Sequence, residues 1–326
     1  MGNIAFLYPG QGSQRVGMGK ELLQANAALF EQYFCQSERA AGLPIAHLCL
    51  EGPLDMLSQT HIAQPALFTC SLALTEYAGS LGLLPNMVAG HSLGEYTAAV
   101  AAGALSFHEG LALVCERGRL MKQQQDRRPG AMVAVLGLAK ETLEQLCQEI
   151  SRRELVLVTN WNAPGQLVVS GTENGVEQLI EAVRAKGEGK AIRLPVKGAF
   201  HSPLMENVQA ALDALTRDLS WRDVALPLVG NVTGTVLTRG REIRRELVEQ
   251  ITSPVQWVLC VERLVMCGCD TLIELGSGQV LTKLVRLIAP QVTAVALDTP
   301  EKVENFVKSR SSARTPFRQK DLQVVA

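Results

Sequence analysis

The apolar positions of the chain follow two spacings, which alternate along its length. Short continuous apolar runs are typical of strands buried on both faces, and the stretches between them have apolar residues at helical spacing. Strands are predicted at Ile4–Tyr8, Met87–Ala89, Leu226–Val229, Thr271–Leu275 and Val292–Leu297. Helices are predicted at Lys20–Phe34, Pro65–Leu81, Glu109–Gln124, Arg241–Ile251, Pro254–Cys267 and Val280–Ile288. This alternation predicts an α/β fold with a mainly parallel sheet covered on both faces.

The middle of the chain has a different rhythm. Strands are predicted at Ala131–Leu138, Leu155–Trp161, Gln166–Gly171 and Lys190–Val196, with helices at Lys140–Ile150 and Glu173–Lys186. This β-α-β-β-α-β order is that of a ferredoxin-like subdomain. We therefore predict a large domain from residues 1–128 and 198–300, interrupted by a small subdomain of residues 129–197. Residues 301–326 are polar and are predicted to form a poorly ordered tail.

A Gly-His-Ser-Leu-Gly sequence at residues 90–94 lies between the run Met87–Ala89 and an alanine-rich helix. A strand, a sharp turn and a helix in direct succession are the setting of a nucleophile elbow, which favours an α/β-hydrolase-like large domain. Gly90 and Gly94 would let neighbouring backbone pass closely. Ser92 would then project from the sheet at a helix N-terminus, whose amides stabilise negative charge. An ordinary turn with a capping serine is the alternative interpretation.

A glycine-rich loop follows the first predicted strand. A dinucleotide site is not expected there, because the spacing is Gly-x-Gly-x-x-Arg and no acidic residue ends a second strand about twenty residues further on. The glycines on either side of Gln11 would instead let its backbone and amide approach a ligand closely. A plain turn would have the same sequence.

Two charged or titratable residues occupy unusual positions. Arg117 lies in the apolar stripe of a helix that starts with a capping box at Ser106, and a buried cation must either be paired or face a cavity that holds an anion. Two interpretations of Arg117 therefore stand, an internal ion pair and an anion-binding site. His201 precedes a helix that Ser202 caps and Pro203 begins. A helix N-terminus disfavours a protonated imidazole, so His201 is a candidate base, with a structural histidine as the alternative.

The composition limits the classes of protein to which the chain can belong. The chain has 326 residues, 47% of them hydrophobic, and a net charge of −1, which indicates a large core and no general attraction to nucleic acid. No apolar stretch is long enough to span a bilayer, and no basic leader is present. We therefore expect no membrane association, and we expect a cytoplasmic location. The eight cysteines are predicted to be reduced. Cys267 and Cys269 have no second Cys or His pair at ligand spacing, so no metal site is expected. No cofactor is expected either.

Taken together, the Gly-Gln-Gly-Ser-Gln and Gly-His-Ser-Leu-Gly-Glu-Tyr sequences, Arg117, Ala-Phe-His-Ser at 199–202 and Gln250 resemble one family. The sequence is similar to the malonyl-CoA:acyl-carrier-protein transacylases, the free-standing relatives of the acyltransferase domains of fatty-acid and polyketide synthases. The resemblance extends from about Ile4 to about Leu297 and includes the ferredoxin-like insertion.

The resemblance implies a catalytic pair with a helper. Ser92 matches the nucleophile that takes the malonyl group from coenzyme A, and His201 matches its general base and acid. Gln250 matches the residue whose main-chain carbonyl orients the histidine in place of a carboxylate. The residues themselves agree with this, since a serine needs a base to attack a thioester and no Asp-to-His spacing suggests a carboxylate triad.

The resemblance also implies three binding roles. The backbone amides of Gln11 and Leu93 match the donors of the oxyanion hole, and Arg117 matches the residue that binds the free carboxylate of malonyl. A buried guanidinium pairs with a carboxylate through two parallel hydrogen bonds, which would explain an arginine in an apolar stripe. Acetyl groups are then expected to bind poorly.

Three functional hypotheses follow. The first is malonyl transfer from malonyl-CoA to the phosphopantetheine thiol of an acyl carrier protein, by a monomeric enzyme without a cofactor. The second is an acyl-thioester hydrolase on the same scaffold, because the elbow serves water as readily as thiols. The third is a docking component of a larger synthase that has kept only the fold. An acidic carrier would meet the basic residues near the subdomain junctions, which are alternatively plain surface charge: Arg127, Arg128, Lys186 and Lys190.

Overall fold

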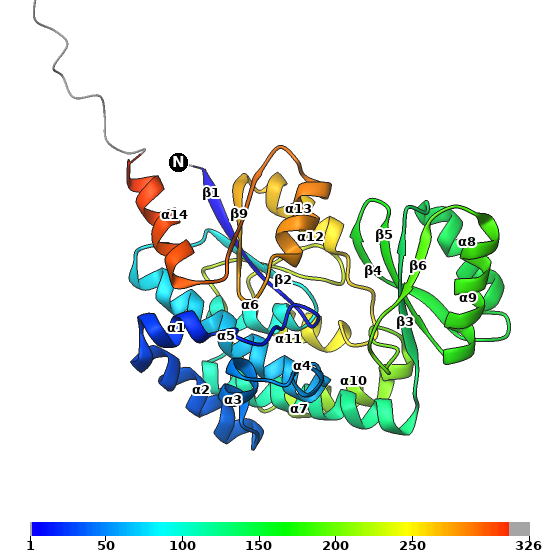
Figure 1. Ribbon diagram of the computed structural model, residues 1–326, viewed down its shortest axis with the longest axis horizontal. Coiled ribbons are helices and arrows are strands. Elements are labelled where there is room, and N and C mark those ends of the chain that lie inside the picture. Colours follow the sequence, from blue (N-terminus) through cyan, green and yellow to red (C-terminus); the bar gives the residue numbers. More distant parts are fainter. Residues whose placement is uncertain (1, 313–326) are drawn as a thin grey trace, which may run out of the picture.

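The structure is a computed structural model and describes residues 2–312. Within this range the strands form a six-stranded sheet of order β10-β9-β1-β2-β7-β8 and a four-stranded sheet of order β4-β5-β3-β6. The two sheets lie in separate parts of the molecule, with the four-stranded sheet and its helices α8 and α9 forming a lobe at one side (Figure 1). The α/β class predicted from the sequence is confirmed.

The large sheet is built around its first strand. Its strands are β1 (Asn3–Tyr8), β2 (Met87–Gly90), β7 (Leu228–Val229), β8 (Val236–Leu237), β9 (Cys269–Leu275) and β10 (Thr293–Leu297). β1 pairs in parallel with β2 and β9, and the edge strand β8 is antiparallel to β7. β8 is not predicted by the sequence, because two residues are too few to show a pattern.

Helices cover both faces of this sheet. Ile4, Phe6 and Tyr8 belong to one apolar core, whereas the alternate residues Ala5 and Leu7 belong to the other. The helices of this part, with the short 3-10 helix η1, are α1 (Lys20–Ala25), α2 (Ala27–Ala41), α3 (Ile45–Leu50), α4 (Leu54–Leu57), α5 (Thr60–Ser80), α6 (Leu93–Ala101), α7 (Phe107–Arg127), η1 (Pro203–Met205), α10 (Glu206–Thr216), α11 (Gly240–Glu249), α12 (Trp257–Met266), α13 (Val280–Ile288) and α14 (Pro300–Ser312).

Three of the predicted helices differ from the structure by more than a small shift of their ends. The helix predicted at Lys20–Phe34 is two helices, because Asn26 breaks the first and caps α2 by accepting a hydrogen bond from Leu29 N at 3.0 Å. α5 begins at Thr60, so Pro65 lies inside the helix and not in its first turn. α12 begins at Trp257, three residues after the Pro254 that was predicted to open it.

The prediction of a poorly ordered tail from residue 301 is also wrong for the residues described. α14 is a regular helix up to Ser312, and its Val303 is fully buried against the large core. The hydroxyl of Tyr77 donates a hydrogen bond of 2.7 Å to Glu304, which links α14 to α5. Residues 313–326 lie outside the described part of the chain.

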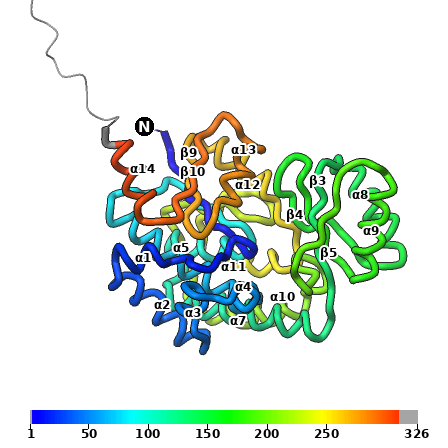
Figure 2. Tube along the Cα trace, viewed as in Figure 1, coloured from blue at the N-terminus to red at the C-terminus, as the bar shows by residue number. Residues whose placement is uncertain are grey.

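The small lobe has the predicted β-α-β-β-α-β order. Its elements are β3 (Ala131–Leu136), α8 (Lys140–Ile150), β4 (Val156–Ala163), β5 (Gln166–Gly171), α9 (Glu173–Lys186) and β6 (Lys190–Arg193). All its strand pairs are antiparallel. The chain enters this lobe after α7 and returns to the large part before α10, as the colours of Figure 2 show. Backbone hydrogen bonds from Val255 N to Thr159 O and from Trp161 N to Val255 O, both 2.9 Å, join the lobe to the large part.

The capping box at the start of α7 gives a test of local stability. Ser106 Oγ accepts from Glu109 N at 3.2 Å, and a carboxylate oxygen of Glu109 accepts from Ser106 N at 2.7 Å. We expect Ser106→Ala to lower the free energy of unfolding by about 1 kcal/mol in urea denaturation, because it removes the acceptor of an N-terminal amide. Ser309→Ala is the control, because this exposed hydroxyl bonds only within its own helix. Equal losses in the two variants would contradict the capping role.

Candidate active site

Ser92 lies at the turn between β2 and α6 in a strained backbone conformation, with φ 53° and ψ −106°. A Cβ at Gly90 would lie 1.9 Å from the carbonyl oxygen of Gly94, and a Cβ at Gly94 would lie 2.0 Å from that of Tyr8. Neither position has room for a side chain. Ser92 does not cap α6 with its side chain, so the capping-serine interpretation is wrong and its hydroxyl is free for another partner.

That partner is His201. The Oγ of Ser92 lies 2.7 Å from Nε2 of His201, and Nδ1 of the same ring lies 2.8 Å from the main-chain oxygen of Gln250. A carbonyl oxygen only accepts hydrogen bonds, so Nδ1 must carry the ring proton. Nε2 is then left as an acceptor for the hydroxyl of Ser92, which is the arrangement that a general base requires.

The surroundings keep this imidazole neutral. His201 is 4% exposed. Burial first, and then the positive charge of Arg117, lowers the pKa of His201 from 6.5 to about 3. Its segment is fixed by the adjacent Ser202, whose Oγ donates to Ala199 O at 2.6 Å and accepts from Leu204 N at 3.3 Å.

Arg117 is buried at 1% exposure and reaches the same hydroxyl. Its Nη1 donates to Gln64 Oε1 at 2.6 Å, and its Nη2 donates to Gln250 Oε1 at 3.1 Å and to Ser92 Oγ at 3.2 Å. Its Cζ lies 5.0 Å from the ring centre of Tyr96.

The partners of Arg117 are therefore neutral. None of the ion pairs in the described part of the chain includes it, which argues against the internal ion pair that the sequence left open. Its buried Nε has no acceptor among residues 2–312. Burial lowers the pKa of Arg117, yet a guanidinium keeps its proton in proteins. A buried cation with only neutral acceptors can exchange them for an anion.

The amide of Leu93 and the loop of Gln11 are the backbone segments next to the turn of Ser92. The N–H of Ser92 itself is occupied, since it donates to Asn231 Oδ1 at 2.8 Å. Leu93 is the first residue of α6, and such an amide has no acceptor within its helix. The loop of Gln11 lies against the elbow, because a Cβ at Gly10 would be 2.4 Å from the carbonyl oxygen of His91.

Asn231 and Glu95 also belong to the site and are missed by the sequence analysis. Asn231 lies between β7 and β8, and its Nδ2 donates to Gly90 O at 2.7 Å. Glu95 is fully buried and accepts from Asn231 N at 2.8 Å and from the side-chain amide of Gln250. Burial and the nearby Glu246 raise the pKa of Glu95. In the sequence, Asn231 resembles an ordinary turn residue and Glu95 an ordinary first-turn acid.

Residues 5–297 match the family model described as "Acyl transferase domain". The chain belongs to the acyl transferase family. It is 39% identical over 310 residues to the malonyl CoA-acyl carrier protein transacylase of Bacillus subtilis (strain 168), covering 95% of this chain and 98% of that protein. The corresponding protein of Escherichia coli (strain K12) is 37% identical over 301 residues, covering 92% and 97%.

Solved structures of acyl transferases have the same fold. The malonyl-CoA:acyl carrier protein transacylase of Xanthomonas oryzae pv. oryzae superposes with a TM-score of 0.90 at 36% identity, over 95% of this chain and 98% of that one. A malonyl-transacylase solved in complex with a type II polyketide acyl-carrier protein has a TM-score of 0.90 at 33% identity, over 94% and 99%.

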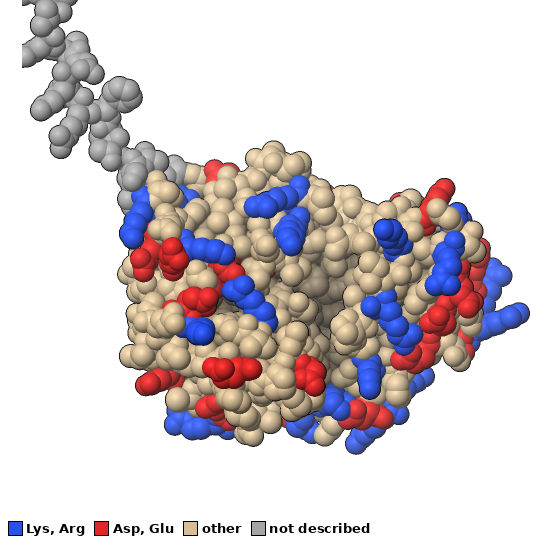
Figure 3. Space-filling view, viewed as in Figure 1, with Lys and Arg blue, Asp and Glu red and all other residues tan. Residues whose placement is uncertain are grey.

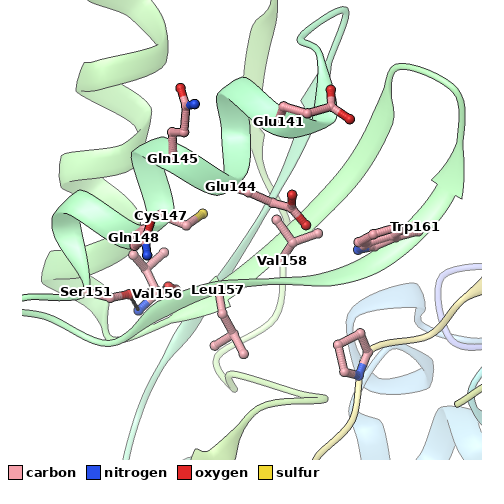
Figure 4. A pocket seen from close by; sticks show the side chains of 11 residues that line it. Glu141, Glu144, Gln145, Cys147, Gln148, Ser151, Val156, Leu157, Val158 and Trp161 are labelled. Atoms are coloured by element: carbon pink, nitrogen blue, oxygen red, sulfur yellow. Dashed lines mark hydrogen bonds between the residues drawn. The ribbon is translucent and has the colours of Figure 1, made fainter.

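The site of this acyl transferase lies at the junction of its two parts. The ring of His91 in the elbow contacts Asn162 of the small lobe, with 2.8 Å between Nε2 and Oδ1. The surface is hollowed between the two parts (Figure 3). A separate pocket of about 700 Å³ lies on the small lobe between α8 and β4, where Glu144 and Trp161 line it (Figure 4). This pocket contains none of the residues around Ser92.

Residues 2–312 contain no helix that is long and apolar enough to cross a membrane. In the same range, no three His, Cys, Asp or Glu side chains are grouped to hold a metal ion.

The low pKa of His201 predicts how the reactivity of Ser92 depends on pH. A base acts in its neutral form, so a pKa lowered to about 3 keeps it active as the pH falls through the ordinary histidine value of 6.5. We expect the rate at which phenylmethylsulfonyl fluoride modifies Ser92 to change less than about twofold between about pH 8 and pH 6. His201→Ala is the control, because it should slow modification at every pH. A fall of the rate centred near the ordinary histidine pKa would contradict the prediction.

Proposed function

We propose that this chain transfers the malonyl group of malonyl-CoA to the phosphopantetheine thiol of an acyl carrier protein, through a malonyl ester of Ser92. The observation that carries the proposal is that a general base and a buried cation meet at one hydroxyl: His201 Nε2 lies 2.7 Å and Arg117 Nη2 lies 3.2 Å from Ser92 Oγ. The names of the relatives support the same reaction.

The first half of the reaction forms the malonyl ester. Ser92 Oγ attacks the thioester carbon of malonyl-CoA while His201 Nε2 takes its proton. The N–H groups of Gln11 and Leu93 hold the oxyanion of the tetrahedral intermediate, and the main-chain oxygen of Gln250 stabilises the imidazolium. The C–S bond then breaks, and the imidazolium returns its proton to the leaving thiolate of coenzyme A.

The second half repeats these steps with another thiol. His201 takes the proton of the phosphopantetheine thiol, whose sulfur attacks the ester carbon of malonyl-Ser92. The C–O bond breaks and Ser92 recovers its proton from the imidazolium. His201 accepts a proton in each attack and returns it in each departure, so one imidazole serves both directions of a reversible transfer. The steps involve no change in oxidation state, and we propose that no cofactor takes part.

Arg117 would select the acyl group. A guanidinium binds a carboxylate through two charge-assisted hydrogen bonds, so malonyl would gain a contact that acetyl lacks. A hydrolase that clears varied acyl groups would gain nothing from such a residue, and none of the relatives described above is named as a hydrolase.

The arrangement of the chain fits a carrier protein as partner. We propose that residues 1–128 and 198–300 act as the catalytic domain and residues 129–197 as a subdomain, with the carrier arm entering at their junction. The relative solved with a polyketide carrier protein supports such an encounter. The basic residues Arg127, Arg128, Lys186 and Lys190 are exposed and would face an acidic carrier. We place the reaction in the cytoplasm and expect a monomer.

Intact-protein mass spectrometry tests the reaction directly. The chain mixed with malonyl-CoA should gain the mass of one malonyl group, and added phosphopantetheinylated carrier protein should then take that mass over. Ser92→Ala should abolish the gain, because it removes the attacking oxygen. Release of free malonate with the carrier unmodified would instead establish a hydrolase, and transfer by Ser92→Ala would overturn the proposal.

Replacement of Arg117 tests the choice of acyl group. We expect Arg117→Ala to lower kcat/KM for malonyl-CoA at least about tenfold, the rate equivalent of a lost charged hydrogen bond, while acetyl-CoA loses much less. Arg119→Ala is the matched control, because this arginine lies on the same helix and pairs at the surface with Glu116. Equal losses for both substrates in Arg117→Ala would indicate a purely structural arginine.

A further inference from the structure

A continuous chain of side-chain hydrogen bonds joins Arg117 to Gln11. Arg117 Nη1 donates to Gln64 Oε1 at 2.6 Å, Gln64 Nε2 donates to Thr60 Oγ1 at 2.9 Å, and Thr60 Oγ1 donates to Gln11 Oε1 at 2.8 Å. The chain therefore connects the residue that would bind the substrate carboxylate with the residue that would hold the oxyanion.

The charge at the end of this chain fixes the direction of its first two bonds. A guanidinium only donates, so the side-chain oxygen of Gln64 must face Arg117 and its NH₂ group must face Thr60. Thr60 accepts from Gln64 and donates its hydroxyl proton to Gln11 Oε1. Reversing either of the first two bonds would turn the NH₂ group of Gln64 against the guanidinium, so that two donors would face each other. The cation thus orders the side chain of Gln11 through three successive hydrogen bonds.

Burial makes this order costly to break. Gln64 is 0% and Thr60 is 3% exposed, so a lost bond leaves a polar group without water to replace its partner. Thr60 and Gln64 are four residues apart in α5 and lie on the same face of that helix. Gln11 is partly buried, and the backbone of its neighbour Gly10 lies close to that of the elbow.

We propose that Thr60 and Gln64 are positioning residues that couple the carboxylate site at Arg117 to the oxyanion donor Gln11. An anion bound at the Nε and Nη2 edge of Arg117 holds the guanidinium in place and leaves the bond from Nη1 to Gln64 intact, so the order of the chain passes through Thr60 to Gln11. An acyl group with a terminal carboxylate then raises the rate of acylation as well as the strength of binding. This inference rests on the proposed function.

Thr60→Val tests the coupling, since it removes the linking hydroxyl and keeps the shape of the side chain. We expect acylation of Ser92 by malonyl-CoA, followed by rapid-quench mass spectrometry, to slow about fivefold to tenfold. The rate with acetyl-CoA should fall much less, so that the malonyl-to-acetyl ratio drops. Thr60→Ser keeps the hydroxyl and should retain the wild-type ratio.

Thr69→Val is the matched control. Thr69 is a fully buried threonine of the same helix, and its Oγ1 has no hydrogen-bond partner among residues 2–312. Its replacement should leave both rates within about twofold of wild type. Gln64→Met interrupts the chain one residue earlier and should lower the same ratio, which keeps the test decisive if Thr60→Val does not fold.

A double-mutant cycle decides between coupling and plain structural support. With acetyl-CoA, Thr60→Val should have a smaller effect in the Arg117→Ala background than in wild type, because the cation that orders the chain is gone. Equal loss for both substrates and in both backgrounds would overturn the coupling. Failure of the proposed function is a separate result, in which the wild-type chain forms no malonyl-Ser92 at all.

Discussion

The site depends on a buried positive charge that pairs with no carboxylate of residues 2–312. Arg117 is surrounded by two glutamine oxygens, one serine hydroxyl and the face of Tyr96. These neutral groups accept hydrogen bonds from its two Nη atoms without removing its charge, and its Nε has no acceptor among residues 2–312. A directly paired carboxylate would have stabilised the arginine, but it would also have occupied the position that an anionic acyl group needs. The same uncompensated charge helps to lower the pKa of His201, so one constraint serves both binding and base catalysis.

The nearest acid shows how this is achieved. Glu95 is fully buried, yet it reaches Arg117 only through Gln250, whose NH₂ group donates to Glu95 while its side-chain oxygen accepts from Arg117. The side-chain amide of Gln250 bridges Glu95 and Arg117, so the two side chains interact through it and not by direct contact. The same carboxyl group holds Asn231, and Asn231 in turn holds the amide of Ser92. The hydrogen bonds of Glu95 therefore support the backbone of the elbow, and Glu95 does not pair with Arg117.

The sequence predicts those parts of the site whose signal is local. The glycines around Ser92, the cation in an apolar stripe and the histidine before a capped helix are all visible in short windows, as is α13, whose predicted bounds are those of the structure. Asn231 could not be found this way, because its contact with Gly90 spans 141 residues. The helix boundaries failed for a related reason. Apolar spacing continues across Asn26. α14 is mostly polar, and its large apolar residues Val303, Phe306 and Val307 pack against a core that the rest of the chain builds.

Backbone strain in the molecule is concentrated where the chemistry would take place. Within residues 2–312, the non-glycine residues with positive φ are Ser92 at 53° and His201 at 57°, and these two are hydrogen-bonded to each other. Such conformations persist only where the surroundings over-determine them. Here Gln250 does so from both sides, since its main-chain oxygen holds the ring of His201 and its side-chain amide donates to the carbonyl oxygen of Ser92 at 2.9 Å. One residue therefore fixes the nucleophile and the base relative to each other, so the orientation of the pair is set by the fold before a substrate arrives.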